Sequence, residues 1–537
     1  MNQIRTAVLS LFVVLAGGCQ PSSAPAPSVA TPPSAPVKPV AAPVQPLLRW
    51  HSAGWQSVTN QADGTRLKEL LALPQTALLR SNTLVALAYN LPVLLFPEAP
   101  TNTDQATKLR PLLDDILTYE SKVVWASASP LRWRMAVKIP VERTGIWTAN
   151  LYDLLVRGEQ LDKIPRTNIT DTSVTVTYSA AETYRYGLND SWVTVERAEP
   201  GYDWEAVARS EAPAGANAWF SLEMQTAILK QPGGLLPPGN QPYARLTMEG
   251  KGANQTSRLS LKFPQALAMS LPPWQVPTNT IKDPVISFTA LRGVGGWWAQ
   301  QDWLKPLQLP NAPQQAYVWA QPQAHYSTFA AFPARGASLL MTNSFSRTNE
   351  FTAAMGKLFF GRMVALKNEL VWAGAPILAP TLKAAPEPQD DHLLLSLFPL
   401  ASSSENLPPA LLEQFMGRTN LLYYDWEITE MRLNQWMRLA PLLSMVANQM
   451  PLNNSKVPYE WLAAIAPKLG NTVTEAELAA PDEIRVLRKS PAGFTGLELY
   501  LLARWLDQRS LPQWDPAHDP IMSLPGIPQA PPTPKQK

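Results

Sequence analysis

The two carboxylates of Asp425-Trp426-Glu427 are the residues of this sequence that come nearest to a catalytic pair. Side chains two positions apart on a β-strand point to the same face, so Asp425 and Glu427 would lie side by side. Glycoside hydrolysis uses two neighbouring carboxyl groups, one as the acid and the other as the nucleophile or base. A glycan-active hydrolase is therefore one hypothesis for this chain.

The residues before the pair weaken that hypothesis. The triplet is similar to the end of the chitinase-type signature Asp-Gly-x-Asp-x-Asp-Trp-Glu. However, Asn420 and Tyr423 occupy the first two aspartate positions, and Leu421 occupies the glycine position. The simpler interpretation, which we favour, places both carboxylates in solvent and packs Trp426 inward.

Metal and nucleophile chemistry has little support in the sequence. The four histidines, His51, His325, His392 and His518, are too far apart for a local metal motif, and a single cysteine excludes thiolate clusters. The motifs of serine hydrolases, phosphate-binding loops and zinc peptidases are missing. We therefore expect no metal and no cofactor, and we favour a protein that is not an enzyme.

A group of tryptophans suggests a binding site of another kind. Trp297, Trp298 and Trp303, together with Trp274, could form an aromatic platform for a sugar or a peptide. The alternative, which we favour, is an aromatic core between two domains.

The clearest chemical signal lies at the N-terminus. Arg5 is the single charge before an apolar run from Ala7 to Ala16, and small residues then lead into Cys19. This order is typical of a secretory signal peptide, and the run is shorter than the ~20 residues that span a bilayer. The sequence resembles the bacterial lipobox, although the usual leucine stands one position early, at Leu15. The resemblance implies that residues 1–18 are removed and that Cys19 carries lipid chains such as palmitate.

The residues after Cys19 predict a tether. Residues 20–46 contain nine prolines and a single charge, Lys38, so they favour an extended polyproline conformation. At ~3.1 Å per residue they could place the folded part up to ~80 Å from the lipid. The aspartate that retains lipoproteins at the inner membrane is replaced by Gln20, so we predict an envelope protein of the periplasm, anchored at the outer membrane.

Composition limits the remaining possibilities. The chain of 537 residues is long enough for two to three domains, and its hydrophobic content of 46% is typical of globular proteins. The formal net charge is +3, and loss of Arg5 with the signal peptide lowers it by one. A net charge this small gives no sign of a basic surface for the phosphates of nucleic acid, and we expect no nucleic-acid partner.

Hydrophobic periodicity predicts a mixture of strands and helices. Residues 131–139 alternate between apolar and basic side chains, which indicates a strand with one buried face. Residues 109–117 carry a helical stripe of leucine and isoleucine. Residues 173–263 are mostly β in pattern, and 421–428 predict a strand that leads into a helix. Strands and helices without a regular βαβ order indicate the α+β class.

The distribution of prolines predicts two lobes of mixed antiparallel sheet and amphipathic helices. A proline-rich stretch at 264–284 separates a first α+β lobe at 47–275 from a second α+β lobe at 284–511. The signal peptide at 1–18 and the lipidated tether at 19–46 precede them, and the proline-rich tail at 512–537 is expected to be disordered. Each lobe has a strand leading into an amphipathic helix, at 133–155 and at 421–443. This suggests a degenerate internal duplication.

Several stretches resemble a group of uncharacterised secreted proteins and lipoproteins of Verrucomicrobia-type bacteria. They are LALPQTALLRSNTLVALA, RPLLDDIL, DPVISFTALRG, RTNLLYYDWEIT, APKLGNTVTEAE and RKSPAGFTGLELYLLARWL. The resemblance covers most of residues 47–507 and implies an envelope location and one folded unit. It implies no activity and assigns no catalytic residue.

These observations favour a bacterial envelope lipoprotein that binds a protein, glycan or lipid, or has a structural role. Two alternatives remain: a glycan-active hydrolase using Asp425 and Glu427, and a lipid or lipoprotein carrier with an apolar cavity.

Overall fold

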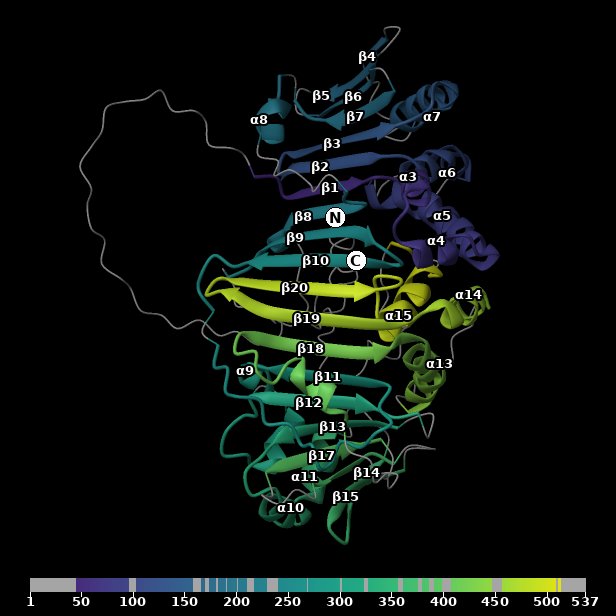
Figure 1. The fold of residues 1–537 in the computed structure, drawn as a ribbon. Helices are drawn as coiled ribbons and strands as arrows, with labels where there is room; N and C mark the ends of the chain where they lie inside the picture. The colour runs from purple at the N-terminus through teal and green to yellow at the C-terminus, as the bar shows by residue number, and fades with distance from the viewer. Residues whose placement is uncertain are drawn as a thin grey trace, which may run out of the picture.

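In the part of the chain that the structure describes, a single antiparallel sheet of 20 strands runs through the protein (Figure 1). The strands are mixed with helices, which confirms the α+β class. The computed structural model describes residues 45–95, 103–157, 166–169, 173–179, 182–189, 191–199, 201–209, 217–228, 240–267, 269–299, 302–322, 327–355, 361–374, 379–385, 391–397, 407–446, 456–508 and 510–512. The predicted signal peptide, Cys19, nearly all of the tether and nearly all of the tail lie outside these residues. Within the described part of the chain, no helix has the length and apolar character needed to cross a membrane.

The first half of the chain contributes ten strands. They are β1 (Leu48–Ser52), β2 (Ser121–Ala128), β3 (Leu131–Lys138), β4 (Arg166–Ile169), β5 (Ser173–Ser179), β6 (Glu182–Asn189), β7 (Trp192–Arg197), β8 (Phe220–Gln225), β9 (Tyr243–Lys251) and β10 (Asn254–Lys262).

The second half contributes the other ten strands. They are β11 (Ser287–Arg292), β12 (Gln315–Ala320), β13 (Thr328–Pro333), β14 (Arg362–Leu366), β15 (Glu369–Ala373), β16 (Thr381–Ala384), β17 (His392–Ser396), β18 (Leu421–Ile428), β19 (Asn471–Ala480) and β20 (Glu483–Ser490).

The two halves use the same strand order. In the first half the order from edge to centre is β4-β5-β6-β7-β3-β2-β1-β8-β9-β10. Strand β10 then pairs with β20, and the order continues β19-β18-β11-β12-β13-β17-β16-β15-β14. From the central β10–β20 pair outward, each half therefore runs through its tenth, ninth, eighth, first, second, third, seventh, sixth, fifth and fourth strand.

This order supports an internal duplication, but with a different match from the one that the sequence suggested. The sequence comparison matched the strand at 133–139 with the strand at 421–428, which are β3 and β18. In the sheet, β3 occupies the third-strand position of its half, and the strand in that position of the other half is β13. Both the predicted lobes contribute to one continuous sheet, and the predicted boundary at 264–284 lies between β10 and β11.

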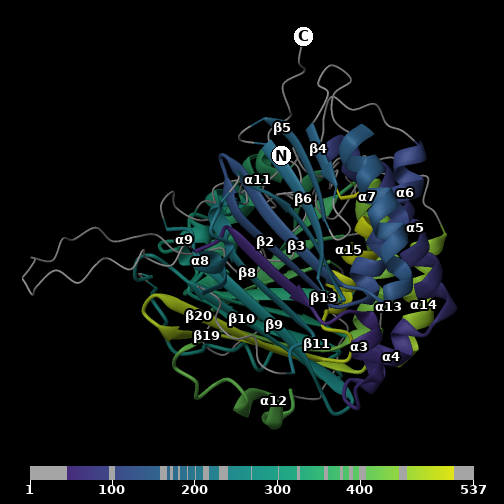
Figure 2. The same ribbon diagram turned by 90° about the horizontal axis from the view of Figure 1, so that it is seen from above.

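Most of the helices lie between strands of the same half. The first half contains α3 (Trp55–Asn60), α4 (Thr65–Leu71), α5 (Pro74–Leu95), α6 (Thr103–Thr118), η1 (Val141–Arg143), α7 (Thr144–Arg157), α8 (Trp204–Arg209) and η2 (Thr226–Ile228). The second contains α9 (Gly295–Trp298), η3 (Asp302–Leu307), α10 (Ala337–Phe345), α11 (Thr348–Met355), α12 (Pro409–Glu413), α13 (Thr429–Val446), α14 (Val457–Ile465), η4 (Ala466–Lys468) and α15 (Gly496–Leu506). Seen from above, α5, α6, α7, α13 and α14 are grouped along one side of the strands, away from α8, α9 and α12 (Figure 2).

Local sequence signals explain where several elements begin. Pro74 is the first residue of α5, a position at which proline has no hydrogen bond to lose. The α15 helix begins after Thr495, whose side chain accepts from the Glu498 N–H while Glu498 returns a bond to the Thr495 N–H. This capping box satisfies two helix-end donors. In β3 the predicted alternation is confirmed, because Val137 is fully buried whereas its neighbour Lys138 is exposed.

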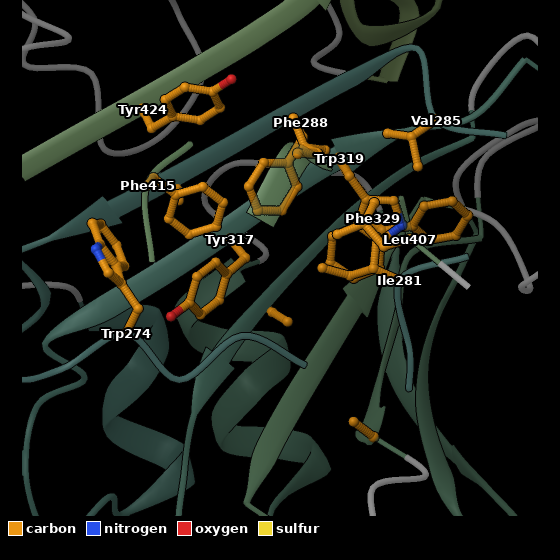
Figure 3. Packing of buried hydrophobic residues seen from close by; sticks show 14 of the residues in the cluster. Trp274, Ile281, Val285, Phe288, Tyr317, Trp319, Phe329, Leu407, Phe415 and Tyr424 are labelled. Atoms are coloured by element: carbon orange, nitrogen blue, oxygen red, sulfur yellow. The ribbon is translucent and has the colours of Figure 1, made fainter. Parts of the chain in front are cut away.

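An aromatic cluster fills one side of the sheet in the second half. Phe288, Tyr317, Phe415 and Tyr424 are all fully buried, and Trp274 packs edge-on to Phe415 with ring centroids 5.5 Å apart (Figure 3). Offset and edge-on contacts of this kind stabilise aromatic cores beyond the burial of their area. The cluster joins β11, β12 and β18 to the loops on this side.

Arg292, at the end of β11, fixes the loops around this cluster. Its side chain is 2% exposed and its guanidinium lies 4.5 Å from the centre of the Trp274 ring. It donates to four backbone carbonyl groups at N···O distances of 2.5 to 3.0 Å, those of Pro272, Arg418, Thr419 and Leu421. A buried guanidinium is tolerated here because its donors are satisfied.

We expect the Arg292→Met variant to be less stable by at least about 3 kcal/mol, because four buried carbonyl groups lose their donor. Urea unfolding followed by tryptophan fluorescence measures the change. Arg292→Lys keeps the charge but not the planar fork, and should fall between the variant and the wild type. An Arg292→Met protein as stable as the wild type would show that the carbonyl contacts are dispensable.

Candidate functional site

Asp425 and Glu427 lie on β18, in the middle of the second half, and both are buried. Asp425 is 6% exposed and Glu427 is 5% exposed. The expectation that both carboxylates face solvent is therefore wrong. Trp426 points to the opposite face, where it is partly buried against the aromatic cluster. The alternation was read correctly, but both faces of β18 are covered.

Two helices cover the face that carries the carboxylates. The chain passes directly from β18 into α13, and β20 leads through a short turn into α15, so both helices fold back beside these strands (Figure 1). The start of α15 packs against the backbone of α13. A Cβ atom on Gly496 would lie 2.6 Å from the Leu433 nitrogen, so only glycine allows this approach. The close packing keeps solvent away from the carboxylates.

The two carboxylates have different partners. Asp425 Oδ1 accepts a hydrogen bond of 2.7 Å from the Thr289 hydroxyl on β11, whereas its buried Oδ2 has no hydrogen-bond partner among the described residues. Glu427 Oε1 accepts a hydrogen bond of 2.7 Å from the Gly496 N–H. Glu427 therefore binds the N-terminus of α15, where the free N–H groups and the helix dipole favour a negative charge.

A buried arginine on α13 adds a positive charge that forms no ion pair among the described residues. Arg432 is 7% exposed, and its side chain donates to Gln435 Oε1 over 2.7 Å and to the Thr328 hydroxyl over 3.3 Å. It acts on the carboxylates through its charge, since no direct hydrogen bond joins it to Asp425 or Glu427 among the contacts of the described residues. Burial lowers its pKa.

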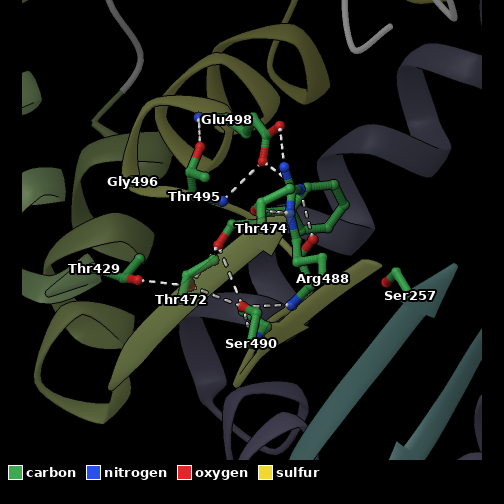
Figure 4. Close-up of polar contacts among 12 residues, drawn as sticks. Ser257, Thr429, Thr472, Thr474, Arg488, Ser490, Thr495, Gly496 and Glu498 are labelled. Carbon is green, nitrogen blue, oxygen red and sulfur yellow. Dashed lines mark hydrogen bonds and ion pairs between the residues drawn. The ribbon is translucent and has the colours of Figure 1, made fainter. Parts of the chain in front are cut away.

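A second arginine forms a complete ion pair between β20 and α15. The Arg488 guanidinium donates to both carboxylate oxygens of Glu498, over 2.7 and 3.0 Å, and to the Thr474 hydroxyl over 2.9 Å (Figure 4). A bidentate pair of this geometry is strong and well defined. Burial lowers the pKa of Arg488, but the charge and hydrogen bonds of Glu498, together with the effects of Tyr423 and Asp425, outweigh burial and raise it.

These groups belong to a larger set of polar side chains, which we call the polar seam. It consists of two rows across β11, β18, β19, β20 and β10: Ser287, Glu427, Thr472, Ser490 and Gln255 in the first row, and Thr289, Asp425, Thr474, Arg488 and Ser257 in the second. Hydroxyl contacts connect the first row to the helices, as the Thr472 hydroxyl bonds to those of Thr429 and Ser490 (Figure 4).

The buried position changes the acidity of both carboxyl groups. Burial raises the pKa of Asp425 to about 6, against the partial effect of the Thr289 hydrogen bond. Burial, together with the negative charge of Asp425, raises the pKa of Glu427 to about 7. Glycan hydrolysis needs a raised pKa on one of two carboxyl groups, but carboxylates this deeply buried are not accessible to a polysaccharide chain. The arrangement is better suited to holding helices against the sheet.

The two platform tryptophans whose side chains the structure describes, Trp298 and Trp274, do not lie in one group. Trp298 is partly buried beside Phe332, with ring centroids 5.9 Å apart. Trp274 belongs to the aromatic cluster, a different hydrophobic group. The side chains of Trp297 and Trp303 lie outside the described part of the structure. Within that part, no group of three or more His, Cys, Asp or Glu side chains is placed to hold a metal ion.

The sequence pattern does not identify the charged groups around the carboxylates, namely Arg432, Arg488 and Glu498. A signal for the polar seam was present, because each of four strands carries two polar residues at positions i and i+2. These pairs are Ser287 and Thr289, Asp425 and Glu427, Thr472 and Thr474, and Arg488 and Ser490. That pattern is typical of a solvated strand face, so only the pairing of the strands beneath two helices shows that the face is buried.

The raised pKa values make stability dependent on pH in a defined direction. The folded protein holds protons that the unfolded chain loses above about pH 4, so this contribution is complete below pH 4 and is lost as the pH rises through about 6 to 7. Glu427→Gln removes the ionisation and keeps an oxygen for the Gly496 N–H. We expect it to raise stability at pH 8 by up to about 3 kcal/mol and to have little effect at pH 4.

Urea unfolding of both proteins at a series of pH values measures this difference. Glu475→Gln, on the solvent-facing side of β19, is the matched control and should show a difference near zero at every pH. A Glu427→Gln protein with the same offset at pH 4 and pH 8 would contradict the expected linkage.

The contact between α13 and α15 can be tested at Gly496. We expect Gly496→Ala to destabilise the protein by about 2 kcal/mol or more, because the added methyl group meets the α13 backbone. Gly145 on α7 is the control, since a Cβ there has no neighbour within 4 Å, and alanine should stabilise that helix by up to about 1 kcal/mol. Equal effects of the two substitutions on thermal unfolding would argue against the close approach.

Comparison with known proteins assigns no family to the chain. No family model matches it, and no curated protein matches it significantly. A solved structure titled crystal form III of TP0453 has 10% sequence identity and a TM-score of 0.22, covering 42% of this chain and 79% of that one. Crystal form I of TP0453 also has 10% identity, with a TM-score of 0.21 and coverage of 43% and 82%. Similarities this distant carry no argument, and the resemblance to secreted Verrucomicrobia-type proteins stays a prediction.

Proposed function

We propose that this protein is a lipid-anchored component of the bacterial envelope with a binding or structural role, and that it is not an enzyme. The observation that carries the proposal is the N-terminal sequence. A signal-peptide pattern ends at Cys19, which is the only cysteine of the chain. It has no partner for an internal disulfide, and the end of a signal peptide is not a position for a core residue or a nucleophile.

The placement of Asp425 and Glu427 supports the non-enzymatic part of the proposal. They were the best catalytic candidates in the sequence, and each is at most 6% exposed. Their partners are a threonine hydroxyl and a helix N-terminus. These contacts attach α15 and β11 to β18, which is a structural role.

The sheet face opposite α6 and α7 supports a binding role. Buried Arg49 bonds to Glu223, which also accepts from the more exposed Arg245. Next to them, the guanidinium groups of Arg132 and Arg134 lie 4.8 and 5.9 Å from the centres of the Tyr202 and Trp204 rings. Arg49 and Glu223 lie beneath α8, but the partly exposed Arg132, Arg134 and Arg245 beside these aromatic rings suit a polar partner, such as a protein or a glycan. The tether would allow this face to meet its partner at a distance from the membrane.

The anchor is tested by mass spectrometry of the mature N-terminus. We expect the first residue to be Cys19 with attached acyl chains, and the protein to be recovered with membranes. The Cys19→Ala variant should lack the acyl mass and lose membrane association, because it cannot form the thioether. An unmodified Cys19 in protein recovered from membranes would overturn the anchor. Independently, turnover of a glycan substrate that is lost in Glu427→Gln would overturn the non-enzymatic role.

A further inference from the structure

The polar seam joins two helices to the sheet through charged groups. Glu427 on β18 binds the first N–H of α15, and Arg488 on β20 binds Glu498 on the same helix. On α13, the Arg432 guanidinium donates to the Gln435 side chain, which in turn donates to the Gln321 carbonyl. The contacts that hold α13 and α15 against the sheet therefore include the charged groups of the seam.

The first half of the sheet shows that the fold does not require a polar seam. On the same face of the sheet, the corresponding strands β1, β8 and β9 and the C-terminal part of β10 carry apolar side chains, whereas Gln255 and Ser257 at the start of β10 belong to the polar seam. The apolar side chains are Leu48, Leu222, Met224, Ala244, Leu246, Leu259 and Leu261. Apolar residues at such positions usually give a seam that is at least as stable as buried charges. The polar residues of the second half are thus a specific feature rather than a consequence of the architecture.

The charges of the seam do not balance when all of its groups are ionised. Arg488 is matched by Glu498 in a bidentate pair. Arg488 also acts on Asp425 through its charge, but the guanidinium without an ion-pair partner of its own among the described residues is that of Arg432, which acts on both Asp425 and Glu427. Tyr423, the other titratable group on this face of β18, stays neutral because burial raises its pKa. The threonines and serines of β11 and β19 add no charge, so one carboxylate has no counterpart.

One carboxylate oxygen of the pair lies where a negative charge is hard to solvate. Asp425 Oδ2 is buried and has no hydrogen-bond partner among the described residues. An ionised carboxylate in this position is strongly unfavourable, and binding a proton is the simplest way to neutralise it.

We propose that Asp425 and Glu427 form a proton-dependent clasp: with one proton held by the pair, α13 and α15 close over the sheet, and loss of that proton loosens both helices. In the closed state one carboxylate balances Arg432 and the other is a neutral acid. In the open state both carboxylates are ionised and water reaches the seam. The proton leaves to solvent, and no other chemical change is needed.

The pKa values of the pair place the response of the clasp near neutral pH. The pKa values of about 6 for Asp425 and about 7 for Glu427 place the loss of the second proton between roughly pH 6 and pH 8. Arg432, Arg488 and Glu498 are the charged groups that face the pair from α13, β20 and α15, and Arg432 and Arg488 hold the values below those of an isolated buried acid.

Hydrogen exchange followed by mass spectrometry tests the clasp on the full-length protein. After correction for the chemical exchange rate, we expect amide protection in residues 429–441 and 496–506 to fall at least tenfold between pH 6 and pH 8.5. Protection in α7, which packs near the other edge of the sheet beside β5, should not change. In the double variant Asp425→Asn, Glu427→Gln, protection of α13 and α15 should be independent of pH, because no proton can be lost.

Three results would overturn the proposal. The first is corrected protection of α13 and α15 that does not depend on pH in the wild-type protein, a measurement that needs no variant. The second is an equal loss of protection in α7, which would indicate global unfolding. The third is a double variant that keeps the wild-type pH profile. Glu475→Gln is the matched control and should keep that profile, since Glu475 lies on the other face of the sheet with Arg418 as its partner.

Discussion

The antiparallel pairing of β10 with β20 is the constraint on which the rest of the structure depends. Residues 255–262 pair with 483–490, and every other strand is attached to the sheet on one side or the other of this pair. Because the two strands come from different halves of the chain, their pairing closes a contact over more than 200 positions of sequence, which is entropically expensive. Apolar side chains at one end of the pair, among them Leu261 and Ile484, provide the compensating burial. The identical strand order on the two sides follows naturally from two copies of one unit joined at this point.

Local elements of this fold were predictable because their signals are local. The alternation at 131–139, Pro74 at a helix start and the capping pattern of Thr495 and Glu498 all depend on neighbours within a few residues. The sheet order depends on contacts between distant segments, and no residue pattern in this single sequence encodes it. The duplication illustrates the difference. The pattern of a strand followed by an amphipathic helix matches β3 with β18, which are not equivalent strands. The match fails because helices are inserted at different positions in the two halves. The helices α3 to α6 lie between the first and second strands of one half, whereas α13 and α14 lie between the eighth and ninth strands of the other.

The sequence identifies the two carboxylates of the candidate site, but it predicts that they are exposed to solvent, whereas they are buried. Polar and apolar residues alternate along β18, which in an isolated antiparallel strand indicates one wet face and one buried face. Here the apolar face packs on Phe415 and Phe288, and the polar face lies beneath α13 and α15. Burial of Asp425 and Glu427 follows from the close approach of Gly496 to the α13 backbone, a contact between residues 63 positions apart. Propensity and periodicity carry no information about such a contact, so the sequence alone could identify the pair but not the shift of its pKa values.

The two halves together separate what the architecture requires from what this chain has added to it. Both halves use ten strands in one order, and both cover the same face with helices or loops, so neither feature distinguishes them. The difference is chemical: leucine, methionine and alanine in one half, and hydroxyls, carboxylates and guanidinium groups in the other. Each buried polar group of the seam needs a hydrogen-bond partner. The capping box, the bidentate Arg488–Glu498 pair and the hydroxyl contacts provide partners for most of them. Among the described residues the unpartnered Asp425 oxygen is the exception, and because the surrounding network is so complete, it concentrates the sensitivity of the helix–sheet contact at the Asp425–Glu427 pair.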